Sequence, residues 1–357
     1  MTTSNILSQL GSAGVSTGFK NRIINGAMVI DQRNAGASVS VNSAGAFYAT
    51  DRFRLSGAAS AGVFTGQQTS TAPVGFVNSL KITTTTSATP ASGDSYYVVQ
   101  NIEGYNVADL NWGTANAKTV TLSFWVYSSL TGTFGGALSN NGVTRSYPFT
   151  YSIPVANTWT QISVTVAGDT TGTWTTDNST GIRVYFSLGT GSTLSGSAGA
   201  WAGAQYISAT GATSVVGTNG ATFYITGVQL EVGTTATNFE YRSYGTELAL
   251  CQRYCFVPNM TNSYYIGGCN GANSALATIP FPVQMRAAPT GTFSGAFGGD
   301  NFSVAQSFTA GNVSVNASSV NSARIYFTSG SGSSFSAAQA FTTDSGSTGT
   351  VILSAEL

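Results

Sequence analysis

Hydrophobic and polar residues alternate along much of this chain, which is the period-two pattern of a β-strand with one buried face. The clearest run covers residues 118–130, and its apolar positions are Val120, Leu122, Phe124 and Val126. The same alternation marks three further runs, at residues 160–168, 181–189 and 221–233. The last run changes its apolar face near Thr226 and Gly227, which predicts a β-bulge. Turns rich in Gly, Ser and Asn separate the runs, so the pattern predicts an antiparallel β-sandwich.

One helix is predicted after the sandwich. Residues 245–256 contain good helix formers, and Leu248, Cys251 and Cys255 recur at i, i+3 and i+7 on one face. Thr246 is placed to cap the helix, because its hydroxyl can accept a hydrogen bond from a free backbone N–H of the first turn. The segment is therefore predicted to connect two β regions.

Strand-like segments resume after this helix, at residues 301–308, 312–318, 323–330 and 350–357. The predicted fold class is all-β: an antiparallel sandwich, one short connecting helix and a smaller C-terminal β domain. The chain divides into an N-terminal anchor segment, the sandwich, the helical connector and the C-terminal domain, at residues 1–20, 21–243, 244–256 and 257–357.

Charged residues are scarce, at 7% of the chain where about 25% is typical. The 13 basic and 13 acidic residues balance to a net charge of +0, which disfavours nucleic acid as a partner because phosphates need a basic surface. The chain has no histidine, so histidine-dependent triads, metal sites and proton shuttles are excluded. Low net charge also favours an oligomer or a larger assembly over a free monomer.

The three cysteines, Cys251, Cys255 and Cys269, are predicted to be buried and structural. Three is too few for a disulfide framework, and thiols without histidine make a poor zinc site. No stretch reaches the roughly 18 apolar residues of a membrane helix. The N-terminus also lacks the basic region and apolar core of a Sec signal peptide. We therefore expect no membrane insertion and no cofactor.

The first twenty residues are small and polar, with one apolar cluster at Ile6, Leu7 and Leu10. These three side chains fit one side of a short helix that cannot bury them alone. The segment is either a disordered tail or an anchor peptide that folds onto a partner, and in the second case these three residues are the candidates for attachment.

The acidic residues offer few candidates for a catalytic pair. Asp94, Glu103 and Asp109 are the only acids that lie close together in sequence near aromatics, as a glycosidase pair would require. The alternative is that they pair with arginine or cap turns, so we predict no enzyme activity. Other charged residues are expected to have specific structural partners, foremost Glu231, Glu240 and Arg242, and also Arg22, Arg33, Asp51 and Arg52.

Aromatic residues are abundant, with 16 Tyr and 20 Phe in a chain otherwise rich in hydroxyl and amide groups. Aromatic faces can stack on the C–H face of a sugar while Ser, Thr, Asn and Gln bind its hydroxyls. Four aromatics lie in loop-like contexts and are candidates for glycan binding, namely Trp112, Trp201, Tyr264 and Tyr265. The alternative for each is packing in a core or between subunits.

Several segments together resemble tail-fibre and related virion-surface proteins of tailed bacteriophages. They read NRIINGAMVIDQRNAGA, FYATDRFRLSG, FYITGVQLEVGTTATNFEYRSYGTELALCQRYC, IPFPVQMRAAPT and TVILSAEL. The first portion also resembles, more distantly, jelly-roll carbohydrate-binding modules. Such modules often hold calcium with acids of the closing strand, but the matching positions here are Thr226 and Gly227, which carry no carboxylate, so no metal is expected.

The resemblance implies a virion protein that is assembled in the host cytoplasm, most often as a homotrimer, with a jelly-roll domain. Its N-terminal segment would attach to the phage tail, baseplate or capsid, and its distal loops would bind a host surface glycan without catalysis. The leading hypothesis is thus a tail fibre or baseplate-associated receptor-binding protein. The alternatives are a capsid decoration or head-fibre protein, a polysaccharide depolymerase and a bacterial surface adhesin.

Overall fold

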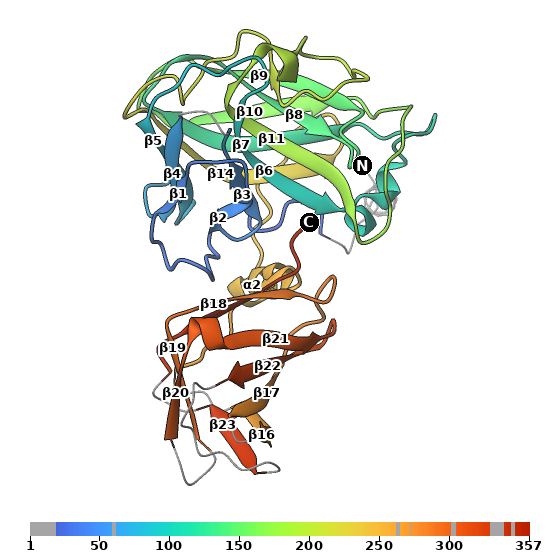
Figure 1. Cartoon of the computed structure of the whole chain (residues 1–357). Helices are drawn as coiled ribbons and strands as arrows, with labels where there is room; N and C mark the ends of the chain where they lie inside the picture. Colours follow the sequence, from blue (N-terminus) through green and yellow to red (C-terminus); the bar gives the residue numbers. More distant parts are fainter. Residues whose placement is uncertain are drawn as a thin grey trace, which may run out of the picture.

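The computed structural model describes residues 19–58, 62–261, 265–271, 273–300, 305–328, 339–343 and 347–357. These residues form a large β-sandwich and a smaller β-rich body, with helix α2 (Tyr244–Gln252) between them (Figure 1). The C-terminus returns to the junction between the two bodies (Figure 1). Within the described ranges, no helix is long and apolar enough to cross a membrane.

The sandwich consists of two six-stranded sheets in which all neighbouring strands are antiparallel. The first sheet has the order β1 (Val39–Val41), β4 (Val63–Thr69), β5 (Ser79–Thr86), β14 (Thr222–Val232), β7 (Val120–Ser128) and β10 (Thr160–Val166). The second sheet has the order β2 (Phe47–Thr50), β3 (Phe53–Ser56), β6 (Ser95–Glu103), β11 (Thr180–Thr190), β8 (Gly132–Ser139) and β9 (Ser146–Ile153).

The strand order is that of a jelly roll. From β5 onward the long strands are divided between the sheets, with β5, β14, β7 and β10 in one and β6, β11, β8 and β9 in the other. This is the double Greek-key arrangement of eight strands. The four early strands extend it, since β1 and β4 continue the first sheet and β2 and β3 the second. The predicted all-β fold class is confirmed.

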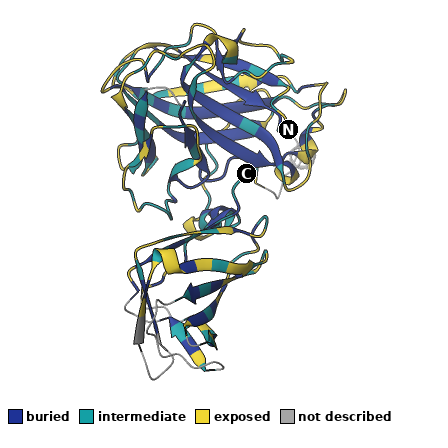
Figure 2. Cartoon of the chain, viewed as in Figure 1, coloured by how far each residue is buried: buried dark blue, intermediate teal, exposed yellow. Residues whose placement is uncertain are grey.

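The core lies between the two sheets, as the alternation predicts. The apolar positions of β7 are at most 1% exposed, and they are Val120, Leu122, Phe124 and Val126. The Phe124 ring lies edge-on to Phe186 of β11 in the opposite sheet, with centroids 5.0 Å apart. Many residues of the sandwich strands are buried (Figure 2). Burial of such apolar side chains is the main force that holds the two sheets together.

The predicted bulge is present in β14. Pairing of β14 with β7 shifts register between Thr226 and Gln229, and Gly227 has φ of +63°. A side chain at Gly227 would also meet the Phe76 ring at 2.7 Å, so glycine fits here on both counts. Beyond the bulge, the Val228 N–H donates to the Gly26 carbonyl at 3.0 Å. The bulge thus turns β14 toward the N-terminal segment of the sandwich.

Helix α2 ends earlier than predicted, at Gln252, and its cap is different. Ser243 is the N-cap residue and its Oγ accepts a bond from the Thr246 N–H at 3.4 Å, so Thr246 is the capped residue and not the cap. Cys255 lies outside the helix, in strand β15 (Cys255–Phe256). The predicted helical face therefore ends at Cys251, because the chain turns after Gln252 to pair with the C-terminal strand.

The smaller body contains two sheets. A three-stranded sheet has the order β15, β24 (Thr350–Ser354) and β18 (Thr290–Ser294). A seven-stranded sheet has the order β20 (Ala305–Thr309), β19 (Ala296–Asp300), β23 (Ala340–Thr343), β16 (Ile266–Gly271), β17 (Ser274–Pro280), β22 (Ser322–Thr328) and β21 (Val313–Ser318). Sequence patterns indicated β20, β21, β22 and β24 but not the others, because Gly-rich strands such as β16 and β19 carry no clear alternation.

The remaining short elements lie in loops of the two bodies. The 3-10 turns are η1 (Gly104–Asn106), η2 (Ala108–Leu110), η3 (Ser192–Leu194) and η4 (Ala310–Asn312). A parallel pair, β12 (Ser195–Gly196) and β13 (Ser208–Ala209), lies in the long connection between β11 and β14. This connection also places Leu194 and Ile207 against Tyr185, on the outer face of the second sheet.

One buried hydroxyl in the core yields a testable prediction. Tyr151 is 5% exposed, and its Oη has no hydrogen-bond partner within the described structure. Replacing Tyr151 with Phe should therefore raise the free energy of unfolding by about 1 kcal/mol, because a buried group without a partner costs about that much or more. Urea denaturation checks this.

The matched control is Tyr254→Phe. The Tyr254 hydroxyl donates to Glu103 at 2.5 Å, so its removal should destabilise the protein by about 1.5–3 kcal/mol, as for a hydrogen bond to a charged group. A loss of stability in Tyr151→Phe would show that its hydroxyl has a partner after all, such as a buried water.

Candidate functional site

The two tryptophans predicted to bind glycan, Trp112 and Trp201, lie together in a cluster that also contains Trp174. The ring centroids of Trp112 and Trp174 are 4.7 Å apart, and Trp201 lies 5.3 Å from Trp112 and 5.4 Å from Trp174. Trp112 is only 7% exposed. The indole N–H groups of Trp112 and Trp201 donate to the carbonyls of Lys118 and Ala167, both at 2.7 Å. Edge-to-face packing and these bonds give the cluster a structural role and leave little of Trp112 for a ligand.

The other predicted residues lie elsewhere. Tyr265 belongs to the smaller body, where its hydroxyl donates to the Asn259 carbonyl at 3.3 Å. The side chain is half-buried and packs against the core of that body, so it does not join the tryptophans. Tyr264 and the predicted attachment residues Ile6, Leu7 and Leu10 lie outside the described residues.

The three candidate acids do not form a catalytic pair. Asp94 precedes β6 and Glu103 ends it, so a strand of about 30 Å separates them. The Asp94 carboxylate accepts a bond from the Ala91 N–H at 2.8 Å in a turn. Asp109 pairs with Arg22 at 2.7 Å and has a half-exposed side chain. Each acid thus has a local structural partner.

Glu103 is held in its charged form. Its carboxylate accepts bonds from Arg253 at 2.6 and 2.9 Å and from the Tyr254 hydroxyl at 2.5 Å. Burial by itself would raise the pKa of Glu103, but these hydrogen bonds outweigh it and hold the pKa below its usual value. A carboxyl group in this state is a poor proton donor.

The three cysteines and Glu231 of β14 also have structural roles. All three cysteines are buried and free, and burial raises the pKa of Cys251 well above its usual value. Glu231 is 3% exposed and accepts bonds from the N–H and hydroxyl of Thr237, at 2.8 and 2.7 Å. Across the described ranges, no cluster of three or more His, Cys, Asp or Glu side chains could hold a metal ion.

The charged residues that were predicted to have specific structural partners do have them. Arg242 pairs with Glu240 at 3.1 Å and with Glu247 at 3.4 Å, and Glu240 also accepts the backbone N–H groups of Lys20 and Asn21. These contacts fasten the start of the sandwich to the segment that follows β14.

A second set lies at the junction of the two bodies, and we call it the junction cluster: Arg33, Asp51, Arg52 and Glu356. Arg33 pairs with Asp51 at 3.2 Å and with Glu356 at 2.9 Å, while Arg52 also pairs with Glu356. All four side chains are at most 8% exposed. Burial raises the pKa of Asp51 to about 6, against the opposing effect of Arg33. Arg22 does not belong to this set, because it pairs with Asp109 instead.

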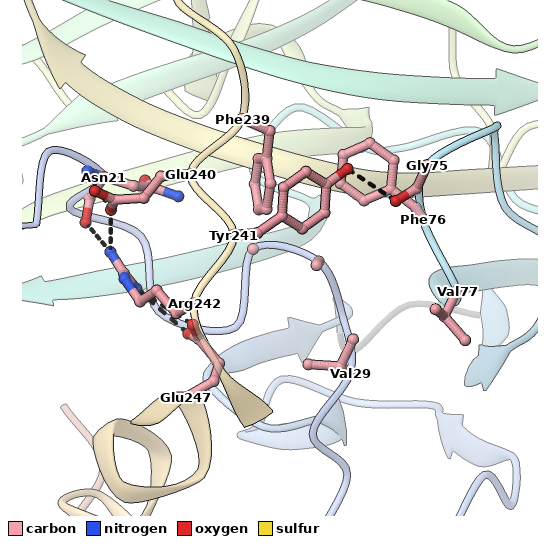
Figure 3. Close-up of a pocket in the computed structure, with 12 residues that line it drawn as sticks. Asn21, Val29, Gly75, Phe76, Val77, Phe239, Glu240, Tyr241, Arg242 and Glu247 are labelled. Atoms are coloured by element: carbon pink, nitrogen blue, oxygen red, sulfur yellow. Dashed lines mark hydrogen bonds and ion pairs between the residues drawn. The ribbon is translucent and has the colours of Figure 1, made fainter. Parts of the chain in front are cut away.

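A cleft of about 100 Å³ lies beside Arg242 (Figure 3). One wall consists of the rings of Phe76, Phe239 and Tyr241, whose centroids are 4.9 to 5.6 Å apart. The opposite wall carries Arg242 between its two glutamates (Figure 3). The Tyr241 hydroxyl already donates to the Gly75 carbonyl at 2.8 Å. Because the polar groups of this cleft bind one another, the cleft offers apolar surface and suits a hydroxyl-rich ligand poorly.

The outer face of the first sheet has a different character. Tyr127 of β7 and Tyr224 of β14 are directly opposite in register, with ring centroids 5.0 Å apart. Trp159, just before β10, lies 5.5 Å from Tyr127 and 6.3 Å from Tyr224. All three rings are half-buried, so each presents part of its surface to solvent.

Two polar side chains, Lys81 and Gln67, lie next to Tyr224 on the neighbouring strands β5 and β4. Tyr224 is opposite Lys81 of β5, and Lys81 is opposite Gln67 of β4. The Lys81 Nζ lies 5.8 Å from the centroid of the Tyr224 ring. Within the described structure, the side chains of Lys81 and Gln67 make no hydrogen bond or ion pair with the protein. We call Gln67, Lys81, Tyr224, Tyr127 and Trp159 the aromatic row.

Sequence reasoning missed the aromatic row, although one signal was available. In the run 118–130, Trp125 and Tyr127 occupy the positions that alternate with the buried ones. Two large aromatics on the outward face of one strand indicate an exposed apolar patch, and such patches often lie at interaction sites. The remaining members come from strands far apart in sequence, so only the pairing of four strands could place them beside Tyr127.

No protein-family model and no curated protein matches the sequence. Among solved structures, the chain is similar to the enzymatically active domain of tailspike protein 4 from bacteriophage CBA120, with 12% identity and a TM-score of 0.30. That match covers 60% of this chain but only 22% of the tailspike chain.

Two carbohydrate-binding modules are similar at the same level. The family 11 module from Clostridium thermocellum, in complex with a β-1,3-1,4-mixed-linked tetrasaccharide, has 12% identity over 57% of this chain and all of its own, with a TM-score of 0.29. TmCBM61, in complex with β-1,4-galactotriose, has 12% identity over 51% of this chain and 88% of its own, with a TM-score of 0.27. The jelly-roll assignment rests on the strand order of the two sheets.

Proposed function

We propose that this chain is a non-catalytic binding protein that holds a neutral glycan on the aromatic row. The observation that carries the proposal is the row itself: three half-buried rings beside two polar side chains that make no hydrogen bond or ion pair within the described protein. Aromatic faces stack on sugar rings, and amide or ammonium groups donate to sugar hydroxyls. An open row across several strands suits an extended oligosaccharide better than a single enclosed sugar.

We further propose that the binding serves host attachment by a bacteriophage. The support is the resemblance of several segments to tail-fibre and virion-surface proteins, together with a net charge of +0 that favours assembly. In a homotrimeric fibre, three copies of the aromatic row would act together, and multivalency would compensate for weak single contacts. Ile6, Leu7 and Leu10 would then attach the fibre to the particle.

The first test is the loss of glycan binding in Tyr224→Ala and Trp159→Ala. A glycan array identifies the ligand and titration calorimetry measures its Kd. Each substitution should raise Kd by about tenfold or more, which corresponds to about 1.4 kcal/mol. Tyr224→Phe keeps the ring and should bind nearly as the wild type does. Tyr105→Ala is the matched control, because Tyr105 is 62% exposed at a different part of the sandwich.

Binding that is unchanged in both Tyr224→Ala and Trp159→Ala would remove the aromatic row as the site. Release of shorter saccharides from the ligand would favour the depolymerase alternative. Immunogold electron microscopy of phage particles tests the second proposal: label at the tail end supports attachment, label over the head favours a decoration protein, and no label removes the virion assignment.

A further inference from the structure

A groove lies between the sandwich and the smaller body, and its volume is about 490 Å³. From the sandwich it is lined by the β2–β3 hairpin and the segment before β1, and from the smaller body by β18 and β24. The lining residues that matter here are Arg54, Tyr48, Asn34, Thr290, Thr292 and Ser354. The groove is separate from the aromatic row, which lies on the outer face of the other sheet.

Arg54 is the unusual residue of this groove. Its side chain projects from β3 directly opposite Tyr48 of β2. One Nη donates to the Tyr97 hydroxyl at 3.1 Å, while the buried Nε has no acceptor. Arg54 makes no ion pair within the described residues. A guanidinium group has five N–H donors, so most of those of Arg54 remain available.

The carboxylates nearest to the groove are already occupied. Glu356 uses one oxygen for Arg33 and the other for Arg52, and Asp51 binds Arg33. Arg33 and Arg52 are thus paired with carboxylates, whereas Arg54 has no carboxylate partner in the described structure. The Arg54 guanidinium is therefore open to an anionic group that the protein itself does not supply.

The rest of the lining suits a sugar. Thr290 and Thr292 are exposed and Ser354 is half-buried, so three hydroxyl-bearing residues line this space. Asn34 lies beside them, and its Nδ2 donates to Asp31 and to the Tyr48 carbonyl, which leaves its Oδ1 as an acceptor. The Tyr48 ring is stacked with the Arg33 guanidinium at 4.4 Å, which fixes its position. We propose that this groove binds a carboxylate-bearing sugar such as a uronic acid, with the acid group paired to Arg54 and the sugar hydroxyls bound by these side chains. This site does not depend on the neutral-glycan site proposed above.

Titration calorimetry of the full chain with galacturonic acid trimer, and with the uncharged galactose trimer of equal length, tests the proposal. We expect the acidic trimer to bind, with a Kd that rises with salt, and Arg54→Gln to raise that Kd by about tenfold or more. Arg324→Gln is the matched control, because Arg324 is also without an ion pair in the described structure but lies in β22, away from the groove. It should bind as the wild type does.

Two further variants keep the test decisive. Thr292→Glu places a negative charge at an exposed position of the groove without touching Arg54, and it should also abolish binding of the acidic trimer. Tyr224→Ala should leave this binding unchanged, so failure at the aromatic row and failure here are distinguishable. The proposal is overturned if the acidic trimer does not bind, if it binds Arg54→Gln as tightly as the wild type, or if the uncharged trimer competes with it equally.

Discussion

Replacement of Glu356 by alanine should lower the free energy of unfolding by about 3–5 kcal/mol, the usual cost of breaking a buried ion pair. Arg52 has a side chain only 2% exposed, and its one carboxylate partner in the described structure is Glu356. Its other contacts are the Asn101 carbonyl and the face of the Tyr254 ring. Arg33 keeps Asp51 in the variant, but Arg52 becomes a buried charge without a counter-ion.

Urea denaturation followed by tryptophan fluorescence measures this effect. All five tryptophans lie in the sandwich, so the signal reports on the body that contains Arg52. Asp109→Ala is the matched control, because it removes the exposed pair with Arg22 and should cost less than about 1 kcal/mol. A cost below 1 kcal/mol for Glu356→Ala would mean that the junction cluster does not hold the two bodies together.

The second large effect is expected at Asn25, which is fully buried. Its Nδ2 donates to the carbonyls of Ile30 and Asp51 at 2.8 and 2.9 Å, and its Oδ1 accepts the Ile30 N–H at 2.9 Å. Asn25→Ala would leave the Ile30 N–H and the Asp51 carbonyl without these partners, while the Ile30 carbonyl still accepts the Asp51 N–H at 3.0 Å. At about 1–3 kcal/mol for each unpaired group, we expect a loss of at least about 2 kcal/mol.

The backbone at this position adds a smaller cost. Asn25 has φ of +59°, a left-handed conformation that asparagine tolerates better than alanine. Asn111 has φ of +54° but is exposed, so Asn111→Ala isolates the conformational cost and should lose only about 1 kcal/mol. Equal losses in the two variants would contradict the role assigned to the Asn25 side chain. Thermal and urea unfolding of both variants measure the difference.

The sequence alone determined which residues face the core of the sandwich. Alternation in the run 118–130 was enough, because a strand places successive side chains on opposite faces whatever it pairs with. The bulge near Thr226 was also readable, since a break in alternation has a local cause. The two errors concern features without such a periodic signal. Thr246 was predicted to cap α2, and the Gly-rich strands of the smaller body were not predicted.

Only the tertiary structure decided which side chains meet. Tyr127 and Tyr224 are almost a hundred residues apart, and they face each other because β14 and β7 pair in one particular register. Glu356 reaches Arg33 and Arg52 because β24 returns to the junction after the whole smaller body has formed. Candidate sites chosen from local context, such as Trp112, could not anticipate this. Strand pairing is a long-range property, and the periodicity of one segment does not specify its neighbour.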